Sequence, residues 1–412
     1  AKAKQVTVRA GARVKEVVEA LRPYGLTLQN YASIAEQQIG GFIQVGAHGT
    51  GASIPPVDEQ VVAMTLITPA LGAIQLSADC EPSLFRLARV GLGALGVVSE
   101  VTLQCVPAHK LVQRTFVESR AEVVKNHEKH LAHQHMRYMW IPHTDTVVVV
   151  TCDPLPAGDH KLSVPEVDEF HATAPLRELL VKRTASVSHE DARSMNFAQL
   201  RDALLALDPL SKAHVVEVNK AEALFWERSQ GERIDWSDRI LGFECGGQQW
   251  VSEVALPCGK VGASDGRDLA YMQDLLDMIE SSDIPAPAPI EQRWTRRSSS
   301  PMSPAHSPHP NDLHTWVGII MYLPTEEASV RDAITRRFWE YNAMCRRELW
   351  SKYDAHQHWA KIEMPDDAEE RCNMKRRLHA RFPMAEFNEV RRVLDPKGIL
   401  TNELLDQIFS EP

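Results

Sequence analysis

The spacing of apolar residues predicts alternating strands and helices in the first hundred residues of the chain. From Val14 to Leu21 apolar residues recur at i, i+3, i+4 and i+7, which places them on one face of a helix. A strand is expected just before it, because Val6 and Val8 alternate with polar neighbours. Further strands are expected over 64–68, 73–76 and 97–105, with a short amphipathic helix over 83–90. This order is typical of an α/β segment.

From about residue 110 the pattern changes to hairpins and long helices. Apolar runs over 137–142 and 146–152 flank a polar turn and predict a hairpin. Between Val330 and Leu349 apolar residues recur at helical spacing and predict a long helix. The stretch 153–194 is polar, contains proline and has weak periodicity, so it is expected to be an insertion or a mobile loop. These features predict an α+β second domain.

Composition and charge narrow the functional classes. The chain has 412 residues, of which 44% are hydrophobic and 24% charged, values typical of a soluble globular protein. The formal net charge of −10 argues against nucleic acid as a partner, because neutralising phosphates needs an excess of lysine and arginine. No stretch reaches the roughly 18 uncharged apolar residues of a membrane span. The seven cysteines are scattered without a C-x-x-C pair and indicate neither a zinc site nor a disulfide framework.

Two patterns resemble known motifs but lack the required context. The glycines of 91–96 match G-x-G-x-x-G, yet a predicted helix precedes them and a predicted strand follows, the reverse of a dinucleotide-binding fold. We expect a tight helix–strand corner, or a turn where the backbone approaches another group. The four histidines between 127 and 135 lack metal-ligand spacing, and their charged neighbours favour a solvated helix face. No metal ligand is predicted.

The densest glycine signal is the segment 39–51, IGGFIQVGAHGTG. Its glycines allow backbone amides to line a phosphate or a flat ring without an obstructing Cβ. A sheet corner that needs positive φ angles would have the same composition, so both interpretations stay open. The Lys-Ser/Thr ending of a P-loop is absent, which disfavours hydrolysis of a nucleoside triphosphate.

A second chemical signal follows the proline-rich stretch 285–289. Glu291 and Arg293 are expected on one strand face, because side chains alternate along a strand. A carboxylate beside a guanidinium can position a substrate hydroxyl and stabilise developing negative charge, although an ordinary cross-sheet ion pair has the same spacing. Lys361, in His-Trp-Ala-Lys, also has a plain surface interpretation. Cys245, among flexible glycines, is a candidate reactive thiol if its thiolate is favoured and exposed.

Several longer stretches together resemble one known family. They are LTLQNYASIAEQQIGGFIQVGAHGTG (26–51), LGVVSEVTLQCV (95–106), DTVVVVTCD (145–153), 241–251 and 286–294, with Glu-Gln-Arg-Trp at 291–294 and His-Trp-Ala-Lys at 358–361. On these residues the chain is identified as a member of the plant and algal L-galactono-1,4-lactone dehydrogenases. These are aldonolactone oxidoreductases of the vanillyl-alcohol-oxidase class of flavoproteins. The resemblance covers nearly the whole chain except the region 153–194.

The resemblance implies an α+β fold with a FAD-binding domain and a substrate, or cap, domain whose sheet covers the isoalloxazine. Residues 1–110 would be the C-terminal part of the FAD-binding domain. Residues 111–380 would be the substrate domain with its insertion near 153–194, and residues 381–412 would return to the FAD domain. The N-terminal part of the FAD-binding domain is expected to be missing. The chain also begins Ala1-Lys2 without an initiator methionine or a transit segment, so further sequence or a separate polypeptide is expected to supply this part.

The resemblance also implies roles for individual residues. Glu291 and Arg293 correspond to the family's substrate-positioning and charge-stabilising pair, and Lys361 to a lysine that faces flavin and substrate. These three are the expected catalytic residues. FAD is the expected cofactor, contacted by the glycine-rich loop and by the turn that ends at 96–98. The expected cofactor-binding set is Gln38, Gly40, Gly41, Gly46, His48, Gly49, Thr50, Gly51, Gly96, Val97 and Val98.

The implied reaction removes two hydrogens from the C2 alcohol of an aldono-1,4-lactone, with hydride transfer to flavin and tautomerisation of the product to ascorbate. Electrons would pass to cytochrome c in the mitochondrial intermembrane space, at the inner membrane, and the chain would associate with respiratory complex I assembly intermediates. The alternative hypothesis is a non-catalytic structural or assembly subunit of complex I that retains the fold. Glu291, Arg293 and Lys361 favour the enzyme, because a structural descendant does not need that set. A different sugar-oxidising flavoenzyme would differ in substrate rather than mechanism.

Overall fold

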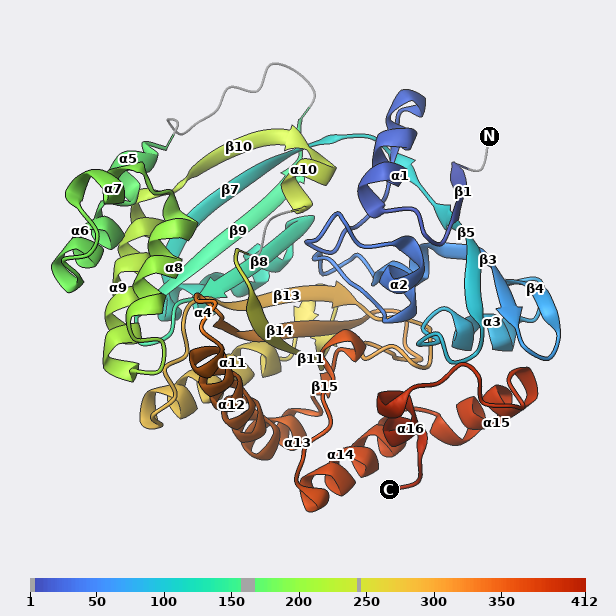
Figure 1. Cartoon of the computed structure of the whole chain (residues 1–412). Coiled ribbons are helices and arrows are strands. Elements are labelled where there is room, and N and C mark those ends of the chain that lie inside the picture. Colours follow the sequence, from blue (N-terminus) through green and yellow to red (C-terminus); the bar gives the residue numbers. More distant parts are fainter. Residues whose placement is uncertain (1–3, 157–166, 243–245) are drawn as a thin grey trace.

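The computed structural model describes residues 4–156, 167–242 and 246–412 (Figure 1). Its strands form a four-stranded sheet, a nine-stranded sheet and a separate two-stranded pair. Figure 1 shows the two larger sheets on opposite sides of the molecule, with helix α2 between them. The arrangement is mixed helix and sheet, as the apolar pattern predicts.

The smaller sheet has the strand order β1-β5-β3-β4, and all its pairs are antiparallel. The strands predicted over 64–68 and 73–76 are confirmed as β3 and β4, which pair from Ala63↔Ser77 to Thr68↔Gly72. The predicted first helix is confirmed too, with its apolar residues buried. The elements here are β1 (Gln5–Arg9), α1 (Val14–Leu21), β2 (Leu26–Thr27), α2 (Ile39–Gln44), β3 (Val61–Thr68), β4 (Gly72–Ser77), α3 (Pro82–Ala88), β5 (Val97–Gln104) and β6 (Val106–Pro107).

The larger sheet has the order β10-β7-β9-β8-β13-β14-β11-β12, and β15 pairs with β11. The predicted hairpin at 137–152 is its β8–β9 pair. Its strands are β7 (Lys110–Ser119), β8 (His135–Trp140), β9 (Thr146–Pro154), β10 (Gly231–Trp236), β11 (Gln249–Lys260), β12 (Ala263–Ser264), β13 (Ile290–Arg296), β14 (Asp312–Tyr322) and β15 (His356–Gln357).

One face of the larger sheet is covered by α11 (Arg267–Ser281) and by the predicted long helix, observed as α12 (Ala328–Cys345) followed by a π-helical turn over Arg346–Trp350. Leu275 and Phe338 from these helices share a buried cluster with Trp294 of β13 and Val317 of β14. Burial of this face leaves the opposite face of β13 and β14 for polar side chains, since neighbours along a strand alternate.

The expectation of a loop over 153–194 is wrong for the residues that the structure describes. Residues 167–194 contain three helices, and two longer ones follow. The weak amphipathic pattern misled the prediction, because apolar residues such as Leu176 and Leu180 are buried against α8 and α9 rather than against the sheet core. The helices are α5 (Glu169–Ala172), α6 (Ala174–Arg183), α7 (His189–Ser194), α8 (Phe197–Leu207) and α9 (Lys212–Arg228).

The solvated-face interpretation of the histidine cluster is also wrong. His127 and His130 lie on α4 (Arg120–Leu131), and both are buried. Their Nδ1 atoms lie 3.0 and 2.8 Å from the hydroxyl of Tyr138, and Nε2 of His127 lies 2.8 Å from a carboxylate oxygen of Asp268. Buried polar groups need such partners, and the partners come from β8 and α11, which local sequence does not reveal.

The glycines of 91–96 form the expected corner between helix and strand, because α3 precedes them and β5 follows. A Cβ at Gly96 would lie 2.5 Å from Cγ of Leu66, so only glycine fits this close approach to β3. The chain ends in helices, of which α15 (Met384–Leu394) and α16 (Glu403–Phe409) bury apolar residues in the same core cluster as the four-stranded sheet. The remaining helices are α10 (Ser237–Leu241), α13 (Ser351–Tyr353) and α14 (Ala368–Arg381).

Candidate active site

Strand β13 places Glu291 and Arg293 on the sheet face away from α11 and α12. Between and beside them, Gln292 and Trp294 are fully buried on the other face. Nε1 of Trp294 donates to Asp268 Oδ2 at 2.9 Å, and Nε2 of Gln292 donates to the backbone oxygen of Asp268 at 3.1 Å. These bonds fix β13 from behind, so the predicted alternation is confirmed and the pair is presented by a rigid strand.

Glu291 lies between two guanidinium groups. Oε1 of Glu291 accepts a hydrogen bond from Nη1 of Arg137 at 3.2 Å, and Oε2 lies 3.3 Å from Nε of Arg293. Its side chain keeps 24% exposure, whereas that of Arg293 keeps 12%. The carboxylate is therefore paired with two guanidinium groups yet accessible to a small molecule.

Arg293 also contacts a carboxylate that sequence analysis did not single out. Nη2 of Arg293 donates to Oε1 of Glu253 on β11 at 2.6 Å. Glu253 and Glu291 are both paired with Gly318 of β14, so the three residues form one row across the sheet. A Cβ at Gly318 would meet nothing within 4 Å, so the surface between the two carboxylates is open.

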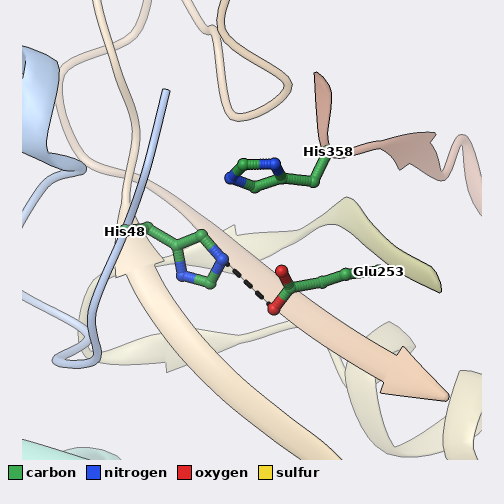
Figure 2. Close-up of side chains that lie close together, drawn as sticks. All are labelled: His48, Glu253 and His358. Atoms are coloured by element: carbon green, nitrogen blue, oxygen red, sulfur yellow. Dashed lines mark ion pairs between the residues drawn. The ribbon is translucent and has the colours of Figure 1, made fainter. Parts of the chain in front are cut away.

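The glycine-rich loop 39–51, which the resemblance predicts to contact FAD and which we call the cofactor loop, reaches this face through His48. The imidazole of His48 is buried and stacks on Trp316 of β14, with ring centroids 3.7 Å apart and planes 12° apart. Its Nε2 lies 3.2 Å from Oε1 of Glu253 (Figure 2). The loop residues that follow are anchored to the sheet as well, because the backbone N–H of Gly51 donates to the oxygen of Trp294 at 2.7 Å and the Thr50 hydroxyl donates to Met136.

The His-Trp-Ala-Lys segment lies at the edge of β11, beside Glu253. The backbone N–H of His358 donates to the Glu253 carbonyl at 2.9 Å, and that of Lys361 donates to the His358 carbonyl at 2.9 Å. The His358 ring is within 5.6 Å of the His48 ring, measured between centroids. The structure thus brings Lys361, half-buried at the end of this turn, to the same end of the sheet.

Charge at this site is dominated by Arg293, a permanent cation. Burial by itself would raise the pKa of Glu253, but the charge of Arg293 and a hydrogen bond from His48 outweigh burial and hold that pKa well below its usual range. Burial lowers the pKa of His48, against the opposing effect of Glu253, and lowers the pKa of His358 to about 3. We therefore describe both histidines as neutral beside an ionised carboxylate.

His48, Glu253 and His358 are also the one grouping of three metal-capable side chains found within residues 4–156, 167–242 and 246–412 (Figure 2). Their ligand atoms lie within 4.8 Å of one another. However, the Arg293 guanidinium already neutralises the carboxylate, and a dication there would face this cation in a buried setting. The grouping is better explained as part of an ion-pair network.

Other predicted cofactor residues lie away from this face. Gln38 is exposed at the N-terminus of α2, where its backbone bridges to Arg13, and Gly40 and Gly41 lie in α2 itself. Val97 is 57% exposed on β5, next to the buried Val98. Their contact with FAD stays a prediction. Cys245 lies outside the described residues.

Comparisons with known proteins identify the family to which the chain belongs. A model of the D-arabinono-1,4-lactone oxidase family matches residues 101–408, and a FAD-binding domain model matches residues 1–76. L-galactono-1,4-lactone dehydrogenase 2 of Oryza sativa subsp. japonica is 54% identical over 99% of this chain and 71% of that protein. The Arabidopsis thaliana L-galactono-1,4-lactone dehydrogenase is 52% identical over 98% of this chain and 69% of that protein.

The chain belongs to the L-galactono-1,4-lactone dehydrogenase family. L-gulonolactone oxidase of Bos taurus is more distant, at 28% identity over 98% of the chain and 81% of that protein. Among solved structures, a cholesterol oxidase from Brevibacterium sterolicum has a TM-score of 0.68 at 16% identity, covering 98% of this chain and 81% of that one. That likeness concerns the fold, which is the vanillyl-alcohol-oxidase type of flavoprotein. Within the described residues, no helix has the length and apolar character needed to cross a membrane.

FAD is the cofactor of this dehydrogenase family, and the residues of this chain fit such a group. Nδ2 of Asn30, Oε1 of Gln37 and Nε2 of Gln60 lie buried without a hydrogen-bond partner among the described residues. Asn30 and Gln37 precede the glycine-rich loop in the chain, and Gln60 follows it. Buried, unpaired donors and acceptors are costly unless a polar ligand satisfies them, and FAD is rich in hydrogen-bonding atoms.

Sequence analysis missed Glu253, Trp316 and Gly318 of this dehydrogenase. One signal was available for the first: Glu253 interrupts an otherwise apolar run, Trp250–Leu256, in which only Ser252 is also polar. A charged residue inside an apolar strand is either at an edge or paired. No local signal could identify Trp316 or Gly318, because their importance depends on which strands lie beside β14.

Proposed function

We propose that this chain carries out the FAD-dependent oxidation of L-galactono-1,4-lactone to L-ascorbate. The observation that carries the proposal is the meeting of three motifs on one sheet face: the Glu291–Arg293 pair, the cofactor loop at His48 and the His-Trp-Ala-Lys turn. The relatives at 52–54% identity carry dehydrogenase names, so the alternative of a non-catalytic complex I subunit has no support among them.

The protein's own residues would act by binding and by charge. Bound FAD supplies the hydride acceptor. Glu291, held between two guanidinium groups, accepts a hydrogen bond from the C2 hydroxyl of the lactone and takes its proton. Arg293 stabilises the negative charge that develops on the substrate oxygen, an effect that is strong where water is excluded. Lys361 orients the lactone from the turn beside β11.

The domain boundaries support a cap arrangement in this proposal. Residues 1–110 and 381–412 would form one domain, and residues 111–380 would form the substrate domain. Helices α15 and α16 bury apolar residues in the same cluster as the four-stranded sheet, which supports the return of 381–412 to the first domain. Met139 and Val148 of the larger sheet also belong to this cluster, so the two domains would share it where they meet. The remaining predicted cofactor residues, from Gln38 to Val98, would line FAD from the first domain.

The proposal also includes the partners and the cellular location of the protein, which are inferred from its family. The aldonolactone substrate and a mitochondrial location are supported by the names of the rice and Arabidopsis thaliana relatives. Cytochrome c as electron acceptor, the intermembrane space and contact with complex I assembly intermediates rest on the resemblance alone. Anaerobic mixing of the reduced protein with oxidised cytochrome c tests the acceptor, since cytochrome c reduction is followed directly by absorbance.

The proposal is tested by the visible spectrum of the FAD-loaded protein, recorded anaerobically before and after addition of L-galactono-1,4-lactone. Bleaching of the flavin band establishes cofactor, half-reaction and substrate class together. L-gulono-1,4-lactone and D-arabinono-1,4-lactone serve as matched alternatives, because they distinguish the substrate within the same chemistry. Absence of a flavin band, or a band that no lactone bleaches, contradicts the proposal.

A further inference from the structure

Glu253 is the point at which the three parts of the candidate site meet. Its carboxylate lies 2.6 Å from Arg293 of β13 and 3.2 Å from His48 of the cofactor loop. Its backbone carbonyl accepts the hydrogen bond from His358. Figure 2 shows the two imidazoles on neighbouring sides of this carboxylate. Only 7% of the residue is exposed, so its charge must be compensated by these neighbours.

The path from Arg293 to Glu253 crosses a whole strand. Arg293 on β13 is paired with Trp316 of β14, and Glu253 belongs to β11 on the far side of β14. The row that contains Glu253 has glycine at position 318, where a Cβ would meet nothing within 4 Å. The Arg293 side chain therefore reaches from β13 across β14 to a carboxylate on β11, while the position of Gly318 itself stays open.

Arg293 has two carboxylates with different surroundings. Glu291 keeps 24% side-chain exposure, whereas Glu253 keeps 9%. A long, flexible side chain needs a fixed partner to keep its planar guanidinium in one orientation, and the buried carboxylate is the fixed one. The exposed carboxylate is the one a substrate can reach.

We propose that Glu253 is a positioning residue, which holds the Arg293 guanidinium across strand β14 and ties it to His48 of the glycine-rich loop, so that substrate and cofactor are presented to each other in one geometry. The inference rests on the proposed function, because it concerns the same site. Glu253 itself does not touch the substrate in this account and acts through Arg293.

The test is a double-mutant cycle on kcat/KM in the FAD-loaded protein, with Glu253→Gln, Arg293→Ala and the double variant. Glu253→Gln is expected to lower kcat/KM by about 100-fold, the cost that a displacement of about 1 Å can carry. Because Glu253 acts through Arg293, the double variant is expected to be no worse than Arg293→Ala. Independent effects that multiply in the double variant overturn the inference.

Glu253→Asp keeps the negative charge but moves the carboxylate away from Arg293 by the length of one methylene group. This variant tests the inference if Glu253→Gln yields no FAD-loaded protein. We expect at least about a tenfold fall in kcat/KM with unchanged FAD content, and wild-type kinetics in this variant overturn the inference. Asp283→Asn is the matched control, because Asp283 pairs with Arg337 at 2.7 Å on the surface, and it should leave kcat/KM unchanged. If none of the lactones bleaches the flavin band of the wild-type protein, the proposed function has failed instead.

Discussion

His48 of the cofactor loop stacks on Trp316 of the larger sheet, with ring centroids 3.7 Å apart and planes 12° apart. The two residues are 268 positions apart in the chain. This contact joins the FAD-binding segment to the sheet that carries Glu291 and Arg293. The position of the glycine-rich loop relative to the strand that carries Glu291 and Arg293 therefore depends on a packed aromatic pair.

Replacing His48 by alanine should weaken the contact between the loop and the sheet. Loss of a fully buried ring and its stacking partner is expected to lower the free energy of unfolding by about 2 kcal/mol and to weaken FAD retention. Urea unfolding and the flavin absorbance remaining after gel filtration measure the two effects. His189→Ala, at an exposed position on α7, is the control. Full FAD retention in His48→Ala would show that the loop is held without this contact.

Glu291→Gln should lower turnover while leaving the fold intact. The amide keeps the size of the side chain but loses the charge and the ability to take a proton, so kcat is expected to fall by about 100-fold. Steady-state kinetics with L-galactono-1,4-lactone measure this fall. Glu340→Gln, which alters a surface ion pair with Arg337 at 2.6 Å, should leave kcat unchanged. A kcat equal to that of the wild type would remove Glu291 from the mechanism.

A larger side chain at Gly318 should obstruct the lactone. A Cβ there meets nothing within 4 Å, and β-branched residues suit strands, so Gly318→Val is expected to leave the melting temperature close to that of the wild type. KM is expected to rise stepwise from glycine to Gly318→Ala to Gly318→Val. Thermal unfolding and KM are measured on all three proteins. Equal KM values would place the substrate elsewhere.

Stability should fall as the pH is lowered from 7 to 5. Burial lowers the pKa of His314 to about 3, whereas an unfolded histidine titrates near 6.5. Between these values the unfolded state binds more protons, so acid favours unfolding, and one such histidine costs about 2 kcal/mol across this interval. Urea unfolding at both pH values measures the loss. His314→Leu should reduce it by that amount, and the exposed His189→Leu should not.

Much of the fold follows from local periodicity. Periodicity predicted four features that the structure contains: the helix over 14–21, the strand pairs observed at 61–77 and 135–154, and the long helix observed from 328. Each of them buries one face against the core, so apolar residues recur in its sequence at the period of a helix or a strand. The helices within 167–194 were not predicted, since their apolar residues are buried mainly against the neighbouring helices α8 and α9 and give a weak pattern.

The residues of the candidate site likewise fall into those that the sequence predicted and those that only the tertiary structure revealed. Alternation along β13 determined that Glu291 and Arg293 share a face, and glycine content together with the family resemblance selected the loop that contains His48. Only the tertiary structure decided that Glu253, Trp316 and Gly318 lie beside them, and that His127 and His130 are buried. The physical reason is that a strand's sequence encodes which side chains share a face, whereas its neighbours are set by pairing between segments far apart in the chain.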